Sequence, residues 1–82
     1  MTIKQQIRKF ILNNYLFTDD DSKLTDAQSL MGSGAMDSTG VLELIMFLEE
    51  QFHIKVADEE MVPANLDSVD NTTAFIERKQ AG

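Results

Sequence analysis

Cysteine is absent from the 82-residue chain, which has one proline and one histidine. Without cysteine there is no disulfide, no thiolate metal site and no cysteine nucleophile. No apolar run reaches the length of a membrane-spanning helix, and the first isoleucines are separated by polar residues, unlike the core of a signal peptide. We therefore expect a soluble cytoplasmic protein.

Basic residues are also scarce, with 7 Lys and Arg against 14 Asp and Glu and a formal net charge of -7. Nucleic acids and anionic membranes are bound through Lys and Arg, so the sequence predicts neither as a partner. An acidic chain favours a protein partner with a basic face. We expect one monomeric domain over residues 1–82, too small for an enzyme cleft with a lid.

Hydrophobic periodicity predicts an all-α fold, a small four-helix bundle with three main helices and one short one. Thr2 and Gln5 form a candidate capping box for the first helix, and Asp67 or Ser68 caps the last. The chain around Ile54 is too short an alternating run to build a sheet. The predicted helices and turns span residues 3–15, 38–52, 58–61, 63–66 and 69–79.

A long first loop, residues 16–36, separates the first two helices. Leu24 and Leu30 are predicted to pin this loop to the core. Its acidic run, Asp19–Asp21, does not start a calcium loop, because positions six and twelve would then be those two leucines instead of Gly and Glu. We interpret this run and Asp58–Glu60 as solvated acidic patches, and no metal site is predicted.

The helix at 38–52 has two distinct faces. One apolar arc is predicted to face the core, and it comprises Val41, Leu44, Ile45, Leu48 and Phe52. The outward side mixes apolar and acidic residues and comprises Thr39, Leu42, Glu43, Met46, Glu49 and Glu50. Leu42 and Met46 could pack under the long loop, or they could form a partner-binding stripe ringed by carboxylates. In the last helix the residues expected to face inward are Val69, Thr73 and Ile76, with Phe75 near them.

Asp37 and Ser38 stand where this second helix begins. Either residue could cap the helix, and an exposed Ser38 could instead carry a phosphodiester, which the helix N-terminus would favour. The two interpretations are compatible if Asp37 is the cap and Ser38 the first helical residue. A serine hydrolase is disfavoured, because the only histidine, His53, is predicted at the far end of the helix and no nucleophile elbow is present.

The segment "MDSTGVLELIMFLEEQFHIKV" resembles the signature of the acyl carrier protein family, and the length and helix pattern agree over nearly the whole chain. The resemblance implies a four-helix bundle with a short third helix. It implies that Ser38, preceded by Asp37, is esterified by 4'-phosphopantetheine, which a phosphopantetheinyl transferase donates from coenzyme A. The transfer would use magnesium on the transferase.

By the same resemblance, the thiol of the arm carries an acyl, aminoacyl or peptidyl group as a thioester, and the domain is not itself an enzyme. Adenylating or acyl-transfer enzymes with basic surfaces would dock on the second helix, at Thr39, Leu42, Glu43, Met46, Glu49 and Glu50. The absence of cysteine fits this function, because the cofactor supplies the thiol.

The chain departs from fatty-acid carriers after Asp-Ser, where Thr39 and Gly40 replace the usual Leu and acidic residue. The Asp-Ser-x-Gly form and the segment "VPANLDSV" resemble stand-alone carriers such as D-alanyl carrier proteins. A specialised carrier is therefore favoured over one of fatty acid synthesis. The alternative is an unmodified acidic helical protein-interaction module, although such a module would have no need of Ser38.

Overall fold

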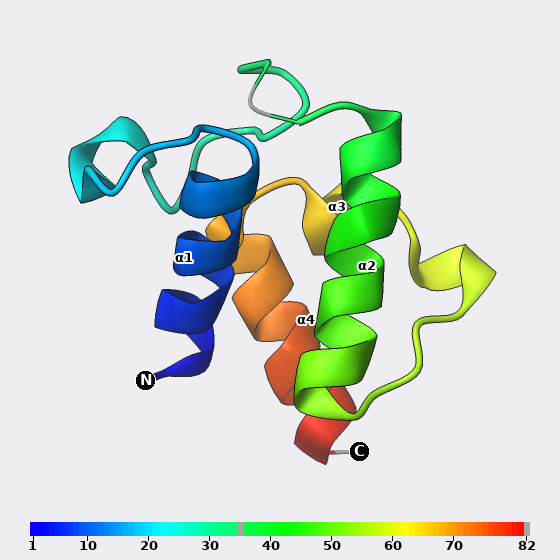
Figure 1. Ribbon diagram of the computed structural model, residues 1–82. Coiled ribbons are helices and arrows are strands. Elements are labelled where there is room, and N and C mark those ends of the chain that lie inside the picture. Colours follow the sequence, from blue (N-terminus) through cyan, green and yellow to red (C-terminus); the bar gives the residue numbers. More distant parts are fainter. Residues whose placement is uncertain (35, 82) are drawn as a thin grey trace.

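The computed structural model describes residues 1–34 and 36–81, and every regular element in these two stretches is helical. The predicted all-α class is therefore confirmed. Figure 1 shows the long helices side by side, with a one-turn helix near the start of the second. The elements are α1 (Ile3–Asn14), α2 (Ser38–Phe52), α3 (Pro63–Leu66) and α4 (Val69–Ala81), with single 3-10 turns at Asp21–Lys23 and Asp58–Glu60.

The predicted helix bounds are close to those of the structure. α2 matches its predicted range, whereas α1 ends one residue early, with Tyr15 as its C-terminal cap. The capping box of α1 is confirmed: Thr2 Oγ1 accepts the Gln5 N–H at 3.1 Å, and Gln5 Oε1 accepts the Thr2 N–H at 2.9 Å. The loop predicted over 16–36 and the domain predicted over 1–82 include Ala35 and Gly82, which lie outside the described residues.

α4 runs two residues beyond its predicted end, to Ala81. Ser68 caps its first turn, since the Ser68 hydroxyl accepts the Asn71 N–H at 3.0 Å. Of the two candidate caps Ser68 is therefore the one used, and Asp67 is left to contact another part of the chain. No helix in the described stretches is long and apolar enough to cross a membrane.

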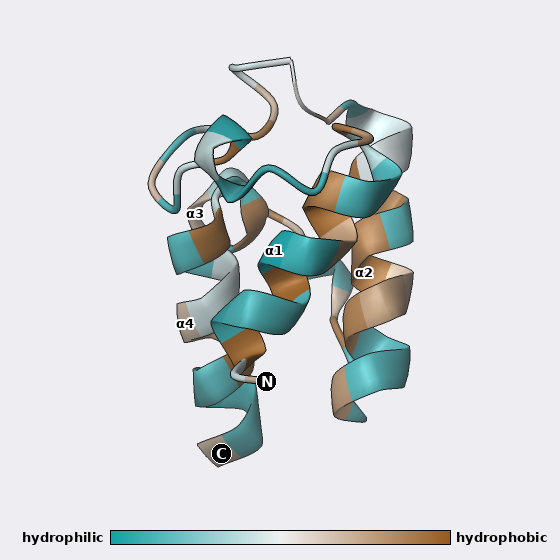
Figure 2. Cartoon of the chain, turned by 60° about the vertical axis from the view of Figure 1, so that its left-hand side comes forward, coloured by the Kyte–Doolittle hydropathy of each residue, from teal (hydrophilic) through white to brown (hydrophobic). Residues whose placement is uncertain are grey.

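The core lies between the long helices, where Figure 2 shows brown apolar residues on α1 and α2. The predicted inward arc of α2 does face the core: Leu44, Ile45 and Leu48 are buried, whereas Val41 and Phe52 pack at the edges of the core and are half-buried. One detail of the predicted core is wrong. Thr72, instead of Thr73, faces inward on α4, and its buried hydroxyl is satisfied by the Ser68 carbonyl at 2.8 Å. Phe75 is a full member of the core.

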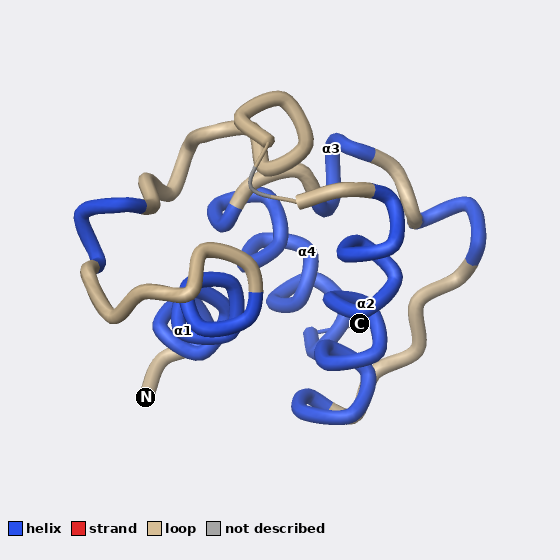
Figure 3. Tube along the Cα trace, turned by 45° about the horizontal axis from the view of Figure 1, so that its top comes forward, coloured by secondary structure: helices blue, strands red, loops and turns tan. Residues whose placement is uncertain are grey.

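The long loop is fixed to the helices, over whose ends it passes in Figure 3. Leu24 and Leu30 are buried, as predicted. On α1, the Arg8 guanidinium donates to Asp26 Oδ1 at 2.6 Å and to the Asp21 carbonyl at 2.8 Å. These contacts hold the loop on either side of the buried Leu24.

Candidate functional site

Ser38 is the first residue of α2 and is exposed. Asp37 is the N-terminal cap: its backbone is extended, and its Oδ1 accepts the Gly40 N–H at 2.7 Å. The compatible arrangement foreseen from the sequence, with Asp37 as the cap and Ser38 as the first helical residue, is therefore confirmed. The first N–H groups of a helix and its dipole favour an anion at this end. A phosphodiester on Ser38 would lie in that field.

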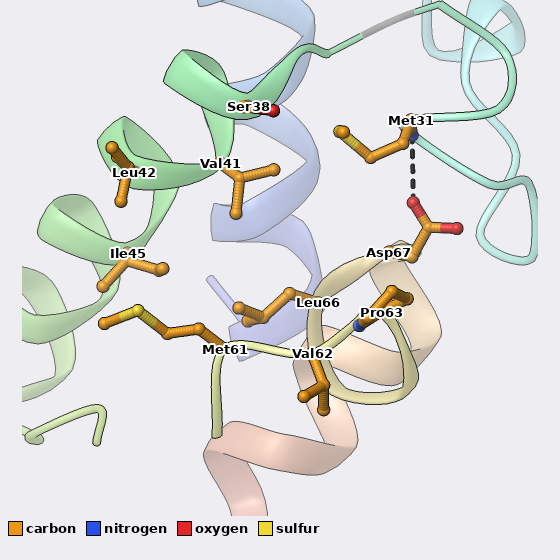
Figure 4. Close-up of a pocket in the computed structure, with 10 residues that line it drawn as sticks. All are labelled: Met31, Ser38, Val41, Leu42, Ile45, Met61, Val62, Pro63, Leu66 and Asp67. Carbon is orange, nitrogen blue, oxygen red and sulfur yellow. Dashed lines mark hydrogen bonds between the residues drawn. The ribbon is translucent and has the colours of Figure 1, made fainter. Parts of the chain in front are cut away.

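An apolar pocket of about 250 Å³ opens directly beside Ser38. Figure 4 shows the serine at its upper rim, with Val41 and Ile45 of α2 on one side and Leu66 of α3 on the other. Further apolar side chains in the lining are Met31, Leu42, Met61, Val62 and Pro63. Because Asp67 is the only other polar residue in the lining, the pocket offers mainly apolar contact surface to a group attached at Ser38.

Asp67 holds the loop that forms one wall of this pocket. Its Oδ1 accepts the Met31 N–H at 2.9 Å, and its other carboxylate oxygen accepts the Ser29 hydroxyl. The Asp67 carbonyl also accepts the Leu30 N–H at 2.6 Å. The segment "VPANLDSV" thus has a structural role: Leu66 is in the core, Asp67 fastens the loop and Ser68 caps α4.

Gly40 is buried at the contact between the start of α2 and the end of α1. A Cβ atom at Gly40 would lie 2.7 Å from Met36 Cγ and 3.0 Å from Tyr15 Cε1, which is too close. The Tyr15 hydroxyl donates to the Gly40 carbonyl at 2.9 Å. Sequence reasoning treated Gly40 only as a departure from fatty-acid carriers and missed this contact. A glycine inside a helix was the available signal, since glycine there often allows close approach.

Partial burial raises the pKa of the Tyr15 hydroxyl above its ordinary value, with further contributions from the negative charges of Glu43 and Asp37. The phenol therefore stays protonated at neutral pH and remains a hydrogen-bond donor. Two side chains therefore bind the backbone of Gly40: the Asp37 carboxylate accepts its N–H, and the Tyr15 hydroxyl donates to its carbonyl.

The predicted outward face of α2 is exposed at five of its six positions: Thr39, Leu42, Glu43, Met46 and Glu50. Leu42 and Met46 are 56% and 67% exposed, so the alternative that they pack under the long loop is wrong. Glu49 differs, because it is half-buried and its Oε2 accepts the Val56 N–H at 3.0 Å. That bond gives Glu49 a structural role in the chain that follows α2.

Two other sequence features lie away from Ser38. His53 is the residue after α2, so the helix separates it from Ser38 by roughly 20 Å, and the two side chains cannot act as a catalytic pair. Within residues 1–34 and 36–81 no group of three or more His, Asp or Glu is placed to hold a metal ion. In the predicted acidic patch, Glu60 instead accepts from Lys79 Nζ at 2.9 Å.

Comparison with known proteins points to carrier proteins. No family model matches the chain. An acyl carrier protein of Akkermansia muciniphila is 37% identical over 79 residues, covering 96% of this chain and 94% of the relative. One of Buchnera aphidicola is 36% identical over 77 residues, covering 94% and 91%. One of Brachyspira hyodysenteriae is 33% identical over 69 residues, covering 84% and 86%.

The helical fold, the capped serine and these relatives define a carrier protein. The chain belongs to the acyl carrier protein family, as its resemblance to the family signature predicted.

The packing at Gly40 predicts that Gly40→Ala destabilises the protein, which is the opposite of the usual effect of this change in a helix. In an exposed helix this change stabilises by about 1 kcal/mol, whereas here the new methyl group meets Met36 and Tyr15. We expect a loss of about 1–3 kcal/mol in the free energy of unfolding, measured by urea denaturation. The neighbouring exposed change Thr39→Ala is the control and should be neutral or slightly stabilising. A stabilised Gly40→Ala variant would contradict the described contact.

Proposed function

We propose that this chain carries an acyl or aminoacyl group on a 4'-phosphopantetheine arm esterified to Ser38, and presents it to partner enzymes without catalysing a reaction itself. The observation that carries the proposal is the placement of Ser38. It is exposed, it begins α2 and it follows the cap Asp37, in a chain of the acyl carrier protein family. We propose that this function is carried out in the cytoplasm, where coenzyme A is available.

The surroundings of Ser38 fit the arm. Asp37 binds its own helix through the Gly40 N–H, so its carboxylate is engaged as a cap. The helix N-terminus favours the negative phosphodiester, and the pocket below gives the arm or an apolar cargo a surface to lie on. Bound at Ser38, the arm would supply a terminal thiol on which the cargo is held as a thioester.

In the modification step the Ser38 oxygen forms a bond to phosphorus as the pyrophosphate bond of coenzyme A breaks. The hydroxyl would pass its proton to a base on the transferase, and adenosine 3',5'-bisphosphate would be the leaving group. Ser38 contributes the oxygen, and the fold contributes its position at the end of a capped helix. The phosphopantetheinyl transferase, with its magnesium, would supply the remaining catalytic groups.

We propose that the exposed face of α2 docks the transferase and the adenylating or acyl-transfer enzyme that loads the cargo. Leu42 and Met46 offer apolar contact area beside Ser38, and Glu43 and Glu50 are exposed carboxylates on the same helix. A partner with an apolar centre and Lys or Arg around it would complement this face. Thr39 and Glu49 complete the predicted surface, Glu49 with one oxygen bound to the Val56 N–H.

We favour a specialised stand-alone carrier over one of fatty acid synthesis. The support is the resemblance of Asp-Ser-x-Gly and "VPANLDSV" to D-alanyl and similar carriers. Gly40 and Asp67 also make contacts within the fold. Because these contacts do not involve the cargo, they do not identify it. The cargo is therefore tested directly, by offering the modified chain to adenylating enzymes of known amino-acid or acyl specificity.

Modification at Ser38 is tested by intact mass after incubation with coenzyme A, magnesium and a broad-specificity phosphopantetheinyl transferase. The wild type should gain one phosphopantetheine, and Ser38→Ala none, because the accepting oxygen is gone. Thr39→Ala removes the neighbouring exposed hydroxyl but keeps the Ser38 oxygen, so this variant should still gain one phosphopantetheine, whatever its rate. A folded wild type that gains no mass would favour the unmodified interaction module instead.

The acidic docking surface is tested by Glu43→Lys. We expect the KM for the carrier in arm transfer to rise about three- to tenfold at low salt, with less effect at high salt, because the exposed charge steers the partner. Glu77→Lys makes the same charge change at an exposed position on another helix, α4, and serves as the control. Equal KM values for the two variants would show that net charge, not this face, matters.

A further inference from the structure

Tyr15 is the C-terminal cap of α1, yet its side chain acts on the start of α2. The hydroxyl donates to the Gly40 carbonyl at 2.9 Å, and a Cβ atom added at residue 40 would lie 3.0 Å from Tyr15 Cε1. The ring edge also packs against Phe10 of α1, with centroids 5.7 Å apart. The phenol is thus held by α1 and placed against the first turn of α2.

Gly40 is only two residues from Ser38, within the same helical turn. Asp37 Oδ1 binds the Gly40 N–H at 2.7 Å, and the Asp37 carbonyl accepts the Val41 N–H at 3.0 Å. These two bonds shape the turn internally, but they do not attach it to the rest of the protein. The Tyr15 hydroxyl attaches the turn to α1, and the Met36 N–H, which donates to the Leu30 carbonyl at 3.1 Å, attaches the preceding residue to the long loop.

The glycine makes the attachment possible. Any side chain at residue 40 would displace the Tyr15 ring or the buried Met36. Gly40 stands where fatty-acid carriers have an acidic residue, and the proposed function assigns no role to its contact with Tyr15. The close contact between Tyr15 at the end of α1 and Gly40 on α2 gives a structural reason for the glycine.

We propose that Tyr15 is a positioning residue for modification: its hydrogen bond to Gly40 holds the first turn of α2 so that the Ser38 hydroxyl is presented in one orientation. This inference rests on the proposed function of Ser38. An enzyme must align an attacking oxygen closely with its target, so a loosened turn slows transfer. Docking on the exposed face of α2 involves other residues and stays intact.

The test is Tyr15→Phe, which keeps the ring and removes the hydroxyl. Its matched control is Thr73→Val, which removes another hydroxyl that donates to a helical carbonyl, that of Val69 at 2.8 Å. Thr73 lies on α4 and does not line the pocket beside Ser38. Each variant loses one hydrogen bond of similar kind, so their general effects on stability should be comparable.

The first readout is amide hydrogen exchange, which needs no cofactor. We expect the Gly40 and Val41 amides to exchange about fivefold faster in Tyr15→Phe, with little change at buried turns of α4. Thr73→Val should not accelerate exchange at Gly40 or Val41. Equal acceleration throughout the chain in Tyr15→Phe would mean a general loss of stability and would overturn the inference.

The second readout is the kinetics of phosphopantetheine transfer to the folded variants. Tyr15→Phe should lower kcat about three- to tenfold and leave the KM for the carrier nearly unchanged, whereas Thr73→Val should match the wild type. If Tyr15→Phe transfers at the wild-type rate, Tyr15 does not position Ser38. If the wild type itself accepts no arm, the proposed function fails, and hydrogen exchange then separately decides whether Tyr15 holds the turn.

Discussion

The bond from the Asp37 carboxylate to the Gly40 N–H determines where α2 begins, and the rest of the site depends on that position. With Asp37 as the cap, Ser38 becomes the first helical residue and is exposed at the positive end of the helix dipole. With a start one residue later, Ser38 would no longer be helical, and the first helical residue would lie roughly 100° further around the axis relative to the apolar arc. The carboxylate thus connects a local capping preference to the position of Ser38 at the end of the helix.

The contacts around this cap come from parts of the chain that are distant in sequence. Tyr15 reaches it from α1, and Asp67 fastens the loop that forms the opposite wall of the pocket. The long loop is therefore part of the site, and Arg8 secures it through Asp26 and Asp21. A chain of this size cannot enclose a deep cleft, but these few hydrogen bonds hold an exposed serine and an adjoining apolar pocket in a defined arrangement.

Much of the fold could be predicted from the sequence, because periodicity and capping are local signals. The bounds of α2, the capping box at Thr2 and the burial of Leu24 and Leu30 followed from such signals. The contacts of Gly40, Asp67 and Glu49 could not be predicted, because each depends on which distant segment packs beside it. The prediction that Thr73 faces inward on α4 was wrong for a similar reason. Thr72 and Thr73 are the same residue type, and only packing against neighbouring elements determines that Thr72 is the buried one.

The central claim is that Ser38 carries the arm in the living cell. The most direct measurement is tandem mass spectrometry of the chain isolated from its native cells, with fragmentation that separates Ser38 from Thr39. The account predicts phosphopantetheine on Ser38, with any acyl or aminoacyl cargo attached at the end of the arm and identified by its mass. A native chain that is uniformly unmodified, or that carries the arm on another residue, would contradict the account.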